Sequence, residues 1–280
     1  MPVVDISELG FEPVRNGGVT SNSGEGPVPS LLMSLFSERY ARACEGLNVR
    51  ARPEIGDAFT RPEVAAPEEG KDPLDQPPAW SPPSRLVLQG HSNSLFRDRL
   101  LAGDVEALVS ALIECEMGLE EIDLACNELG DKGAMVLGRL LAPSGDGASG
   151  QLAPLGGLNI RCNGVGPDGC FELCEALKDN KTLRSLNLRG NPLGNDGGMS
   201  VAKMLHVNSS IQSVDLDDSE IGADVVIALA TVLAANSTIR EISLSNPQAF
   251  SLHNESTFAL GKMLRVNHSL HTLRLGKVGA

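Results

Sequence analysis

The sequence predicts an α/β solenoid, in which short parallel strands alternate with helices along one chain. A segment beginning at Leu155 places apolar residues in the pattern L-x-x-L-x-L, followed by an asparagine and by a run with helical spacing. Similar segments begin at Leu183 and at Ile211, 28 residues apart each time. A fixed period in this range is typical of proteins whose repeats stack only on their neighbours.

The full pattern, L-x-x-L-x-L-x-x-N-x-L, is that of a leucine-rich repeat. We therefore expect a horseshoe-shaped arc with parallel strands on the concave side and helices on the convex side. The chain contains 41% apolar but only 3% aromatic residues, so the predicted core is aliphatic.

The composition divides the chain into two regions. Residues 1–83 contain 12 of the 17 prolines, with 7 basic and 13 acidic residues, and we expect this region to be largely disordered. One helix is expected within it, near residues 30–45, with Ser30 as its N-cap. This helix either caps the first repeat or binds a partner. Residues 53–83 resemble an extended tether.

Residues 84–280 are predicted to form the leucine-rich repeat domain, with about six rungs. An irregular rung, whose helix is N-capped by Asp104, precedes the first regular repeat at Leu119. An insertion at residues 143–151 is expected to form a mobile loop. The fifth rung, from Ile239, is irregular because Pro247 occupies its asparagine position.

The sixth rung begins at Leu270 and is incomplete, since the chain stops at Ala280, before a return helix. A rung is stable when neighbours cover both of its apolar edges. We therefore expect this chain either to be a fragment of a longer repeat protein or to have its C-terminal edge covered by a partner subunit or by self-association.

Asparagines recur at two positions of the repeat. The first set follows the strands, where the side-chain amides are expected to bond buried backbone groups from rung to rung: Asn127, Asn163 and Asn191. The second set follows the helices and matches the glycosylation sequon. We interpret its members as helix ends in the left-handed conformation: Asn180, Asn208, Asn236 and Asn267.

No set of residues indicates catalysis. The sequence lacks a phosphate-binding G-x-x-x-x-G-K-[ST] loop and an H-E-x-x-H zinc motif, and its five histidines are scattered. The six cysteines are expected to be reduced, partly buried core residues without a metal. The sequence therefore predicts a protein that is not an enzyme and binds no cofactor and no metal.

The charge and the chain start limit the partners and the location. The net charge of −13 disfavours binding to nucleic acid. No secretory signal is visible at the start, and the longest apolar run, Val225 to Ala235, is too short to cross a bilayer. We expect a protein of the cytoplasm, the nucleus or both, without membrane contact.

The outward residues of the strands form the predicted concave face, on which we expect a protein partner to bind. Their charges alternate by rung, from acidic to basic and back to acidic. Either this is a solvated face with lateral ion pairs, or it is a docking surface. The candidate partner-binding residues are Asp123, Asn159, Arg161, Arg184, Asn187, Arg189, Asp215 and Asp217.

The 28-residue repeat resembles the ribonuclease-inhibitor-like class of leucine-rich repeats. A narrower resemblance within this class is carried by Val225 to Lys277, with I-A-L-A-T-V-L, the irregular N-P rung, E-S-T and G-K-M-L. It implies a non-enzymatic interaction scaffold inside the cell, in the nucleus or nucleolus and linked to ribosome biogenesis. Other open functions are a regulator of a small GTPase, because GTPase-activating proteins for Ran share this repeat class, and a structural subunit of a large assembly such as a ciliary axoneme.

Overall fold

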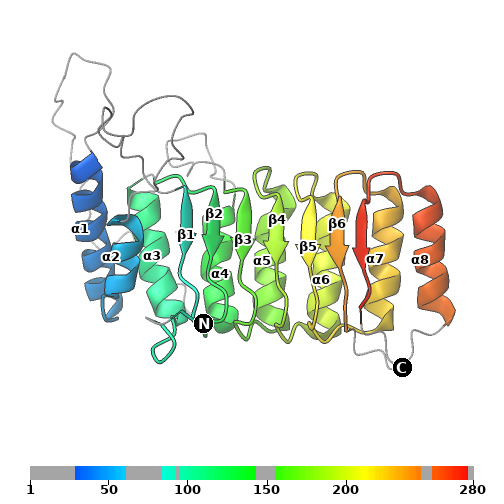
Figure 1. Ribbon diagram of the computed structural model, residues 1–280, viewed down its shortest axis with the longest axis horizontal. Helices are drawn as coiled ribbons and strands as arrows, with labels where there is room; N and C mark the ends of the chain where they lie inside the picture. The colour runs from blue at the N-terminus through cyan, green and yellow to red at the C-terminus, as the bar shows by residue number, and fades with distance from the viewer. Residues whose placement is uncertain are drawn as a thin grey trace, which may run out of the picture.

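The fold is an α/β solenoid in which seven parallel strands form one open sheet (Figure 1). The computed structural model describes residues 29–60, 84–92, 95–115, 117–142, 155–246 and 254–276. The strands are paired in chain order, and their bounds are β1 Arg85–Val87, β2 Glu121–Asp123, β3 Gly157–Asn159, β4 Ser185–Asn187, β5 Ser213–Asp215, β6 Glu241–Ser243 and β7 Thr272–Arg274.

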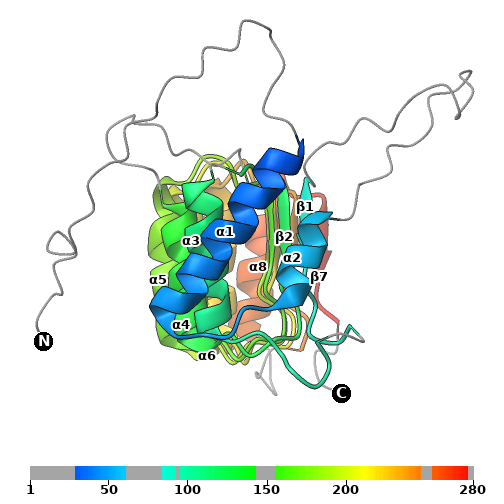
Figure 2. The same cartoon turned by 90° about the vertical axis from the view of Figure 1, so that its left-hand side faces the viewer.

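Helices α3 to α8 form a second layer on one side of this sheet, whereas α1 and α2 lie at its N-terminal end (Figure 2). Their bounds are α1 Pro29–Leu47, α2 Pro53–Thr60, α3 Ala102–Glu114, α4 Gly130–Leu141, α5 Pro167–Asp179, α6 Gly194–Val207, α7 Ala223–Ala235 and α8 Asn254–Val266. The core between the layers is aliphatic because each strand contributes the apolar residues of the repeat, for example Leu183, Leu186 and Leu188 in one rung. Within the described ranges, no helix has the length and apolarity that crossing a membrane requires.

The strand register places equivalent positions of the repeat side by side. Leu158 pairs with Leu186, and Leu186 pairs with Val214, so the apolar columns stack directly. The intervening residues lie on the opposite face of the strands, away from the helix layer. This face, formed by the outward residues of β1 to β7, is called the sheet face below; two of its residues, Asp123 and Ser243, are buried. It corresponds to the predicted concave face.

The first asparagine set joins the rungs as predicted. Asn191 donates from Nδ2 to the carbonyl oxygens of Ile160, at 3.0 Å, and Leu188, at 2.8 Å. Its Oδ1 accepts from the backbone N–H groups of Asn163 and Val165. Because these backbone groups are buried, the amide satisfies donors and acceptors that would otherwise be costly.

The second asparagine set has a different geometry from the predicted left-handed one. Asn208 is extended, with φ −66° and ψ 136°. Its Oδ1 accepts from the N–H groups of Ser210 and Ile211, while its Nδ2 donates to Leu177 O and Asn180 O of the preceding rung. An extended residue can turn the chain and bridge rungs at once, so the prediction of left-handed helix ends is corrected.

Two helices cap the N-terminal end of the solenoid. Helix α1 packs on α3 and buries Phe36, while α2 packs beside β1 and buries Ile55 and Phe59 (Figure 2). The prediction of an extended tether from Pro53 is therefore wrong for residues 53–60. Proline suits the first turn of a helix, where its missing N–H would have no partner. Residues 61–83 lie outside the described ranges.

A buried ion pair fastens this cap to the first rung. Arg52 donates to both carboxylate oxygens of Asp104, at 2.9 and 3.2 Å, and is also paired with Asp98. Arg52 N–H donates to the hydroxyl of Tyr40. Asp104 was predicted as an N-cap, but it lies three residues after the N-cap Leu101, whose N–H its carboxylate accepts at 2.8 Å.

Smaller predictions differ in detail. Helix α1 begins at Pro29, so Ser30 lies within it and is not its N-cap. All six cysteines are free; four are buried and Cys126 is half-buried, but Cys162 is exposed and so is not a core residue. The predicted loop at residues 143–151 and the asparagine position of the fifth rung, Pro247, lie outside the described ranges.

Candidate interaction face

The middle column of the sheet face runs across the strands without a break. The register aligns Asp123 with Asn159, Asn159 with Asn187, and Asn187 with Asp215. Each of these four side chains uses Oδ1 to accept the backbone N–H two residues further along its own strand, at 2.9 to 3.2 Å. This shared bond holds the side chains in one orientation, so the column presents a regular polar surface.

The two asparagines of the column retain an unused donor. Because Oδ1 of Asn159 and of Asn187 accepts a backbone bond, the Nδ2 group of each is the end available to a ligand. Among the described residues, neither Nδ2 group has a hydrogen-bond partner. Both residues are half-buried. The centre of the sheet face therefore offers two amide donors on adjacent strands.

Arg161 lies beside these donors and has no counter-charge. It follows Ile160, which points into the core, so its own side chain is on the sheet face. Across the described part of the chain, its guanidinium forms no ion pair or hydrogen bond. Arg189, on the next rung, differs: it is 3.1 Å from Asp218 and 3.7 Å from Asp217.

The two aspartates of the column have no basic partner in direct contact among the described residues. Asp123 accepts a hydrogen bond from Gln89 at 2.5 Å, which is a neutral donor. Burial raises the pKa of Asp215 above the ordinary aspartate range, and the nearby Asp217 raises it further, while Arg189 and Arg274 act in the opposite direction. These carboxylates therefore lie on either side of the central donors without a basic group in direct contact among the described residues.

Charges at the two ends of the sheet face are paired internally. Arg85 contacts Glu121 at 2.8 Å, and Arg274 contacts Glu241. The sequence prediction did not include these pairs. Aligning the strand leucine Leu86 with Ile122 would have indicated the first one, because that register places Arg85 directly opposite Glu121.

Two of the predicted site residues have roles within the frame. Arg184 lies before β4 and donates from Nη1 to Ser210 O at 3.0 Å, as Arg240 does to Ser269 O one rung later. Asp217 is buried and its Oδ1 accepts from the Ser243 hydroxyl and the Ser245 N–H, both at 2.5 Å. The structure thus places Arg184 at the rim and Asp217 beneath the surface of the sheet face.

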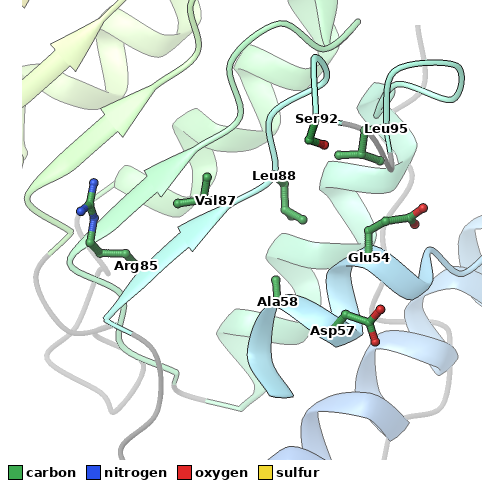
Figure 3. Close-up of a pocket in the computed structure, with 8 residues that line it drawn as sticks. All are labelled: Glu54, Asp57, Ala58, Arg85, Val87, Leu88, Ser92 and Leu95. Atoms are coloured by element: carbon green, nitrogen blue, oxygen red, sulfur yellow. The ribbon is translucent and has the colours of Figure 1, made fainter. Parts of the chain in front are cut away.

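A hollow of about 360 Å³ lies at the first strand, between α2 and β1 (Figure 3). Its apolar wall includes Val87, Leu88 and Ala58, and Glu54 and Asp57 contribute carboxylates from α2. One carboxylate oxygen of Glu54 is buried and has no hydrogen-bond partner among the described residues. No group of three or more histidine, cysteine or acidic side chains in the described ranges could hold a metal ion.

Comparisons with known proteins agree with the repeat assignment. The model of a leucine-rich repeat family matches residues 119–138, 158–174 and 179–202. A search of the curated proteins finds no match. The chain carries leucine-rich repeats and folds as an α/β solenoid.

Two solved structures illustrate the similarity. Actin-binding site 2 of leiomodin-1 is 23% identical, with a TM-score of 0.37, and the match covers 39% of this chain and 62% of that one, which is less than two thirds of its length. The tropomodulin C-terminal domain from Caenorhabditis elegans is 16% identical, with a TM-score of 0.46, and the match covers 59% of this chain and 93% of that one.

Proposed function

Starting from a leucine-rich repeat solenoid, we propose that this protein is a non-enzymatic scaffold that binds a protein partner on its sheet face. The observation that carries the proposal is the contrast between the ends of the face and its centre. The ends hold ion pairs and Arg189 is paired with Asp217 and Asp218, whereas the Arg161 guanidinium and two amide donors at the centre have no partners in the described chain.

Unpaired polar groups at the centre of a face favour binding over a purely structural role. An exposed ion pair contributes little, so Arg85 with Glu121 and Arg274 with Glu241 add mainly to solubility. Half-buried donors that lack a partner lose part of their hydration without compensation. A partner could accept hydrogen bonds from these donors and place positive charges beside Asp123 and Asp215. These contacts would replace the hydration that the groups lose. The large open face of a solenoid is suited to such binding.

The proposal is tested by capturing partners with the full chain. We expect Arg161→Glu to weaken capture strongly, because it reverses a central guanidinium that has no ion pair among the described residues. The matched control is Lys203→Glu, the same reversal at an exposed position of α6 on the helix layer. Thermal unfolding is expected to change little for either variant. Equal capture by the two variants would refute binding through the sheet face.

The partner is the finer part of the proposal. The segment Val225 to Lys277 is similar to leucine-rich repeat-containing protein 34, a resemblance that points to ribosome biogenesis and to a location in the nucleus, nucleolus or cytoplasm. Ribosome-assembly factors are therefore the first proteins to seek among captured partners. Recovery of a Ran-like GTPase or of axonemal proteins would favour the regulatory or structural alternatives. The net charge of −13 supports a protein partner and not a nucleic acid.

We also propose a second contact, through the C-terminal edge of the sheet. Strand β7 is last in the sheet order, and α8 exposes apolar side chains, including Phe258 at 65% and Leu264 at 54%. An unpaired strand edge beside exposed apolar residues favours association with a partner subunit or a second copy. Light scattering across a concentration series tests self-association, and Phe258→Ser is expected to reduce it. A monomer at every concentration would refute self-association through this edge.

A further inference from the structure

The centre of the sheet face has an order of charges that specifies its ligand more closely. Along the middle column, a carboxylate at Asp123 is followed by the amides of Asn159 and Asn187 and then by a second carboxylate at Asp215. Arg161 adds a positive charge beside the two amides. Along the column, an acidic position is therefore followed by a central region of hydrogen-bond donors with one positive charge, and then by a second acidic position.

We propose that this column recognises an extended segment of the partner in which an acidic residue has a basic residue two positions before it and another two positions after it. The inference rests on the scaffold function proposed above and names the chemistry of its ligand. The segment would lie along the solenoid, across β2 to β5.

Spacing supports an extended segment over a helical one. Three strand intervals separate Asp123 from Asp215, or about 14 Å. In an extended chain, alternate side chains face the same side about every 6.6 Å, so the first and fifth residues are separated by about 13 Å. The third residue then lies midway, over the strands of Asn159 and Asn187. In a helix, five residues rise by only about 6 Å from first to last.

Chemistry at the centre favours an acidic residue. A carboxylate is an acceptor with two oxygens, so it can accept from both Nδ2 groups or from one of them and Arg161. Lysine in that place would bring only donors toward Asn159, Asn187 and Arg161. The backbone bond made by each Oδ1 fixes the orientation of the amide, because a flipped amide would give up that bond.

Chemistry at the flanks favours basic residues. Asp215 bears the cost of partial burial without a cation in direct contact, and its pKa is raised above the ordinary range as a result. A partner cation would stabilise the ionised form and lower that pKa. Asp123 has only a neutral donor, Gln89, and its own backbone as described partners, so its charge is also uncompensated by direct contact.

The test uses the full chain and synthetic peptides with a constant glycine–serine frame. The three facing positions carry every combination of lysine, serine and glutamate, and affinity is measured by fluorescence anisotropy at low salt, where exposed charges are least screened. We expect the lysine–glutamate–lysine order to bind most tightly. Its isomer with the order lysine–lysine–glutamate, which has the same composition and net charge, should bind about fivefold more weakly.

A variant then identifies the site on the protein. Arg161→Glu is expected to change the preferred central residue from glutamate to lysine, whereas Lys203→Glu should leave the ranking unchanged. Equal binding of the two isomers, or an unchanged ranking with Arg161→Glu, would overturn the inference. So would a peptide set in which no member binds. Partner capture decides the scaffold function separately, since a partner with another charge order would still be lost with Arg161→Glu.

Discussion

Replacing Asp104 with asparagine would test how the N-terminal cap is held. Asp104 is 5% exposed and faces Arg52, which is 8% exposed, with both carboxylate oxygens accepting from its guanidinium. These hydrogen bonds are the main reason that the pKa of Arg52 is raised above its ordinary value. The asparagine side chain keeps an oxygen for the N–H of Leu101, so Asp104→Asn removes the charge and leaves the helix start intact.

The expected loss follows from leaving a buried cation with less compensation. Breaking a buried pair by removing one partner typically costs about 3–5 kcal/mol. Arg52 keeps its contact with Asp98 and its bonds to the carbonyl oxygens of Asp98 and Arg99, so we expect the lower end, about 3 kcal/mol. The loss should appear first as release of α1 and α2, because Arg52 joins them to α3.

Urea unfolding of the full chain measures the loss, and hydrogen exchange locates it. Amide protection in α1 should fall, while protection in α5 and α6 should persist until global unfolding. The matched control is Asp98→Asn, which alters the exposed partner of the same arginine and should leave the unfolding midpoint nearly unchanged. If both variants behave alike, or if Asp104→Asn lowers protection equally in all helices, the proposed role of the clamp is refuted.

Three further predictions concern the repeat frame and its thiols. Asn191→Ala removes buried hydrogen bonds to two rungs and should lower the free energy of unfolding by about 2–4 kcal/mol. The comparison is Ser219→Ala, which removes one hydrogen bond and should lower it by at most about 1 kcal/mol. Urea unfolding measures both changes. Because the pKa of Asp215 is raised on folding, its contribution to stability is present at low pH and is lost as the pH rises through the folded pKa. Asp215→Asn should therefore raise the melting temperature at neutral pH by a small amount, and the gain should vanish below the ordinary aspartate pKa; a less stable variant at neutral pH would contradict this. In thiol titration of native protein, Cys162 should react readily and Cys174 only after unfolding, since Cys162 is exposed and Cys174 is buried; equal rates would contradict the described burial.

The repeat frame could be predicted because its evidence is periodic. The spacing of Leu155, Leu183 and Ile211 determines which residues enter the core, and the asparagine after each strand indicates where the buried turn needs a polar partner. Both arguments depend on distance along the chain and on residue type, which the sequence states directly. For this reason the strand order and the role of Asn191 were predicted correctly.

The N-terminal cap, helices α1 and α2, could not be predicted in the same way, because its sequence does not follow the 28-residue repeat. Pro53 lies in a region rich in proline, and composition favoured a tether over a helix of eight residues. Phe36 and Phe59 are far apart in sequence, yet their ring centroids are 4.3 Å apart. Contacts of this kind depend on how the cap folds back on α3 and β1. The partner of Arg52 is another example, since Asp104 lies 52 residues further along the chain.

The repeat pattern indicated which residues point outward from the strands, but it did not indicate which of their charges are paired. The repeat places Arg161 and Arg189 at equivalent positions, and the sequence gives no reason to separate them. Their difference comes from the next rung: Arg189 lies beside Asp217 and Asp218, whereas the position opposite Arg161 on its next rung is Arg189 itself, which is already paired. The face pairs its charges at both ends and at Arg189, so the polar groups without partners among the described residues are the Arg161 guanidinium and the amides of Asn159 and Asn187. We therefore expect specificity to depend on the central rungs, and substitutions at Arg85 or Arg274 to alter partner affinity far less than Arg161→Glu does.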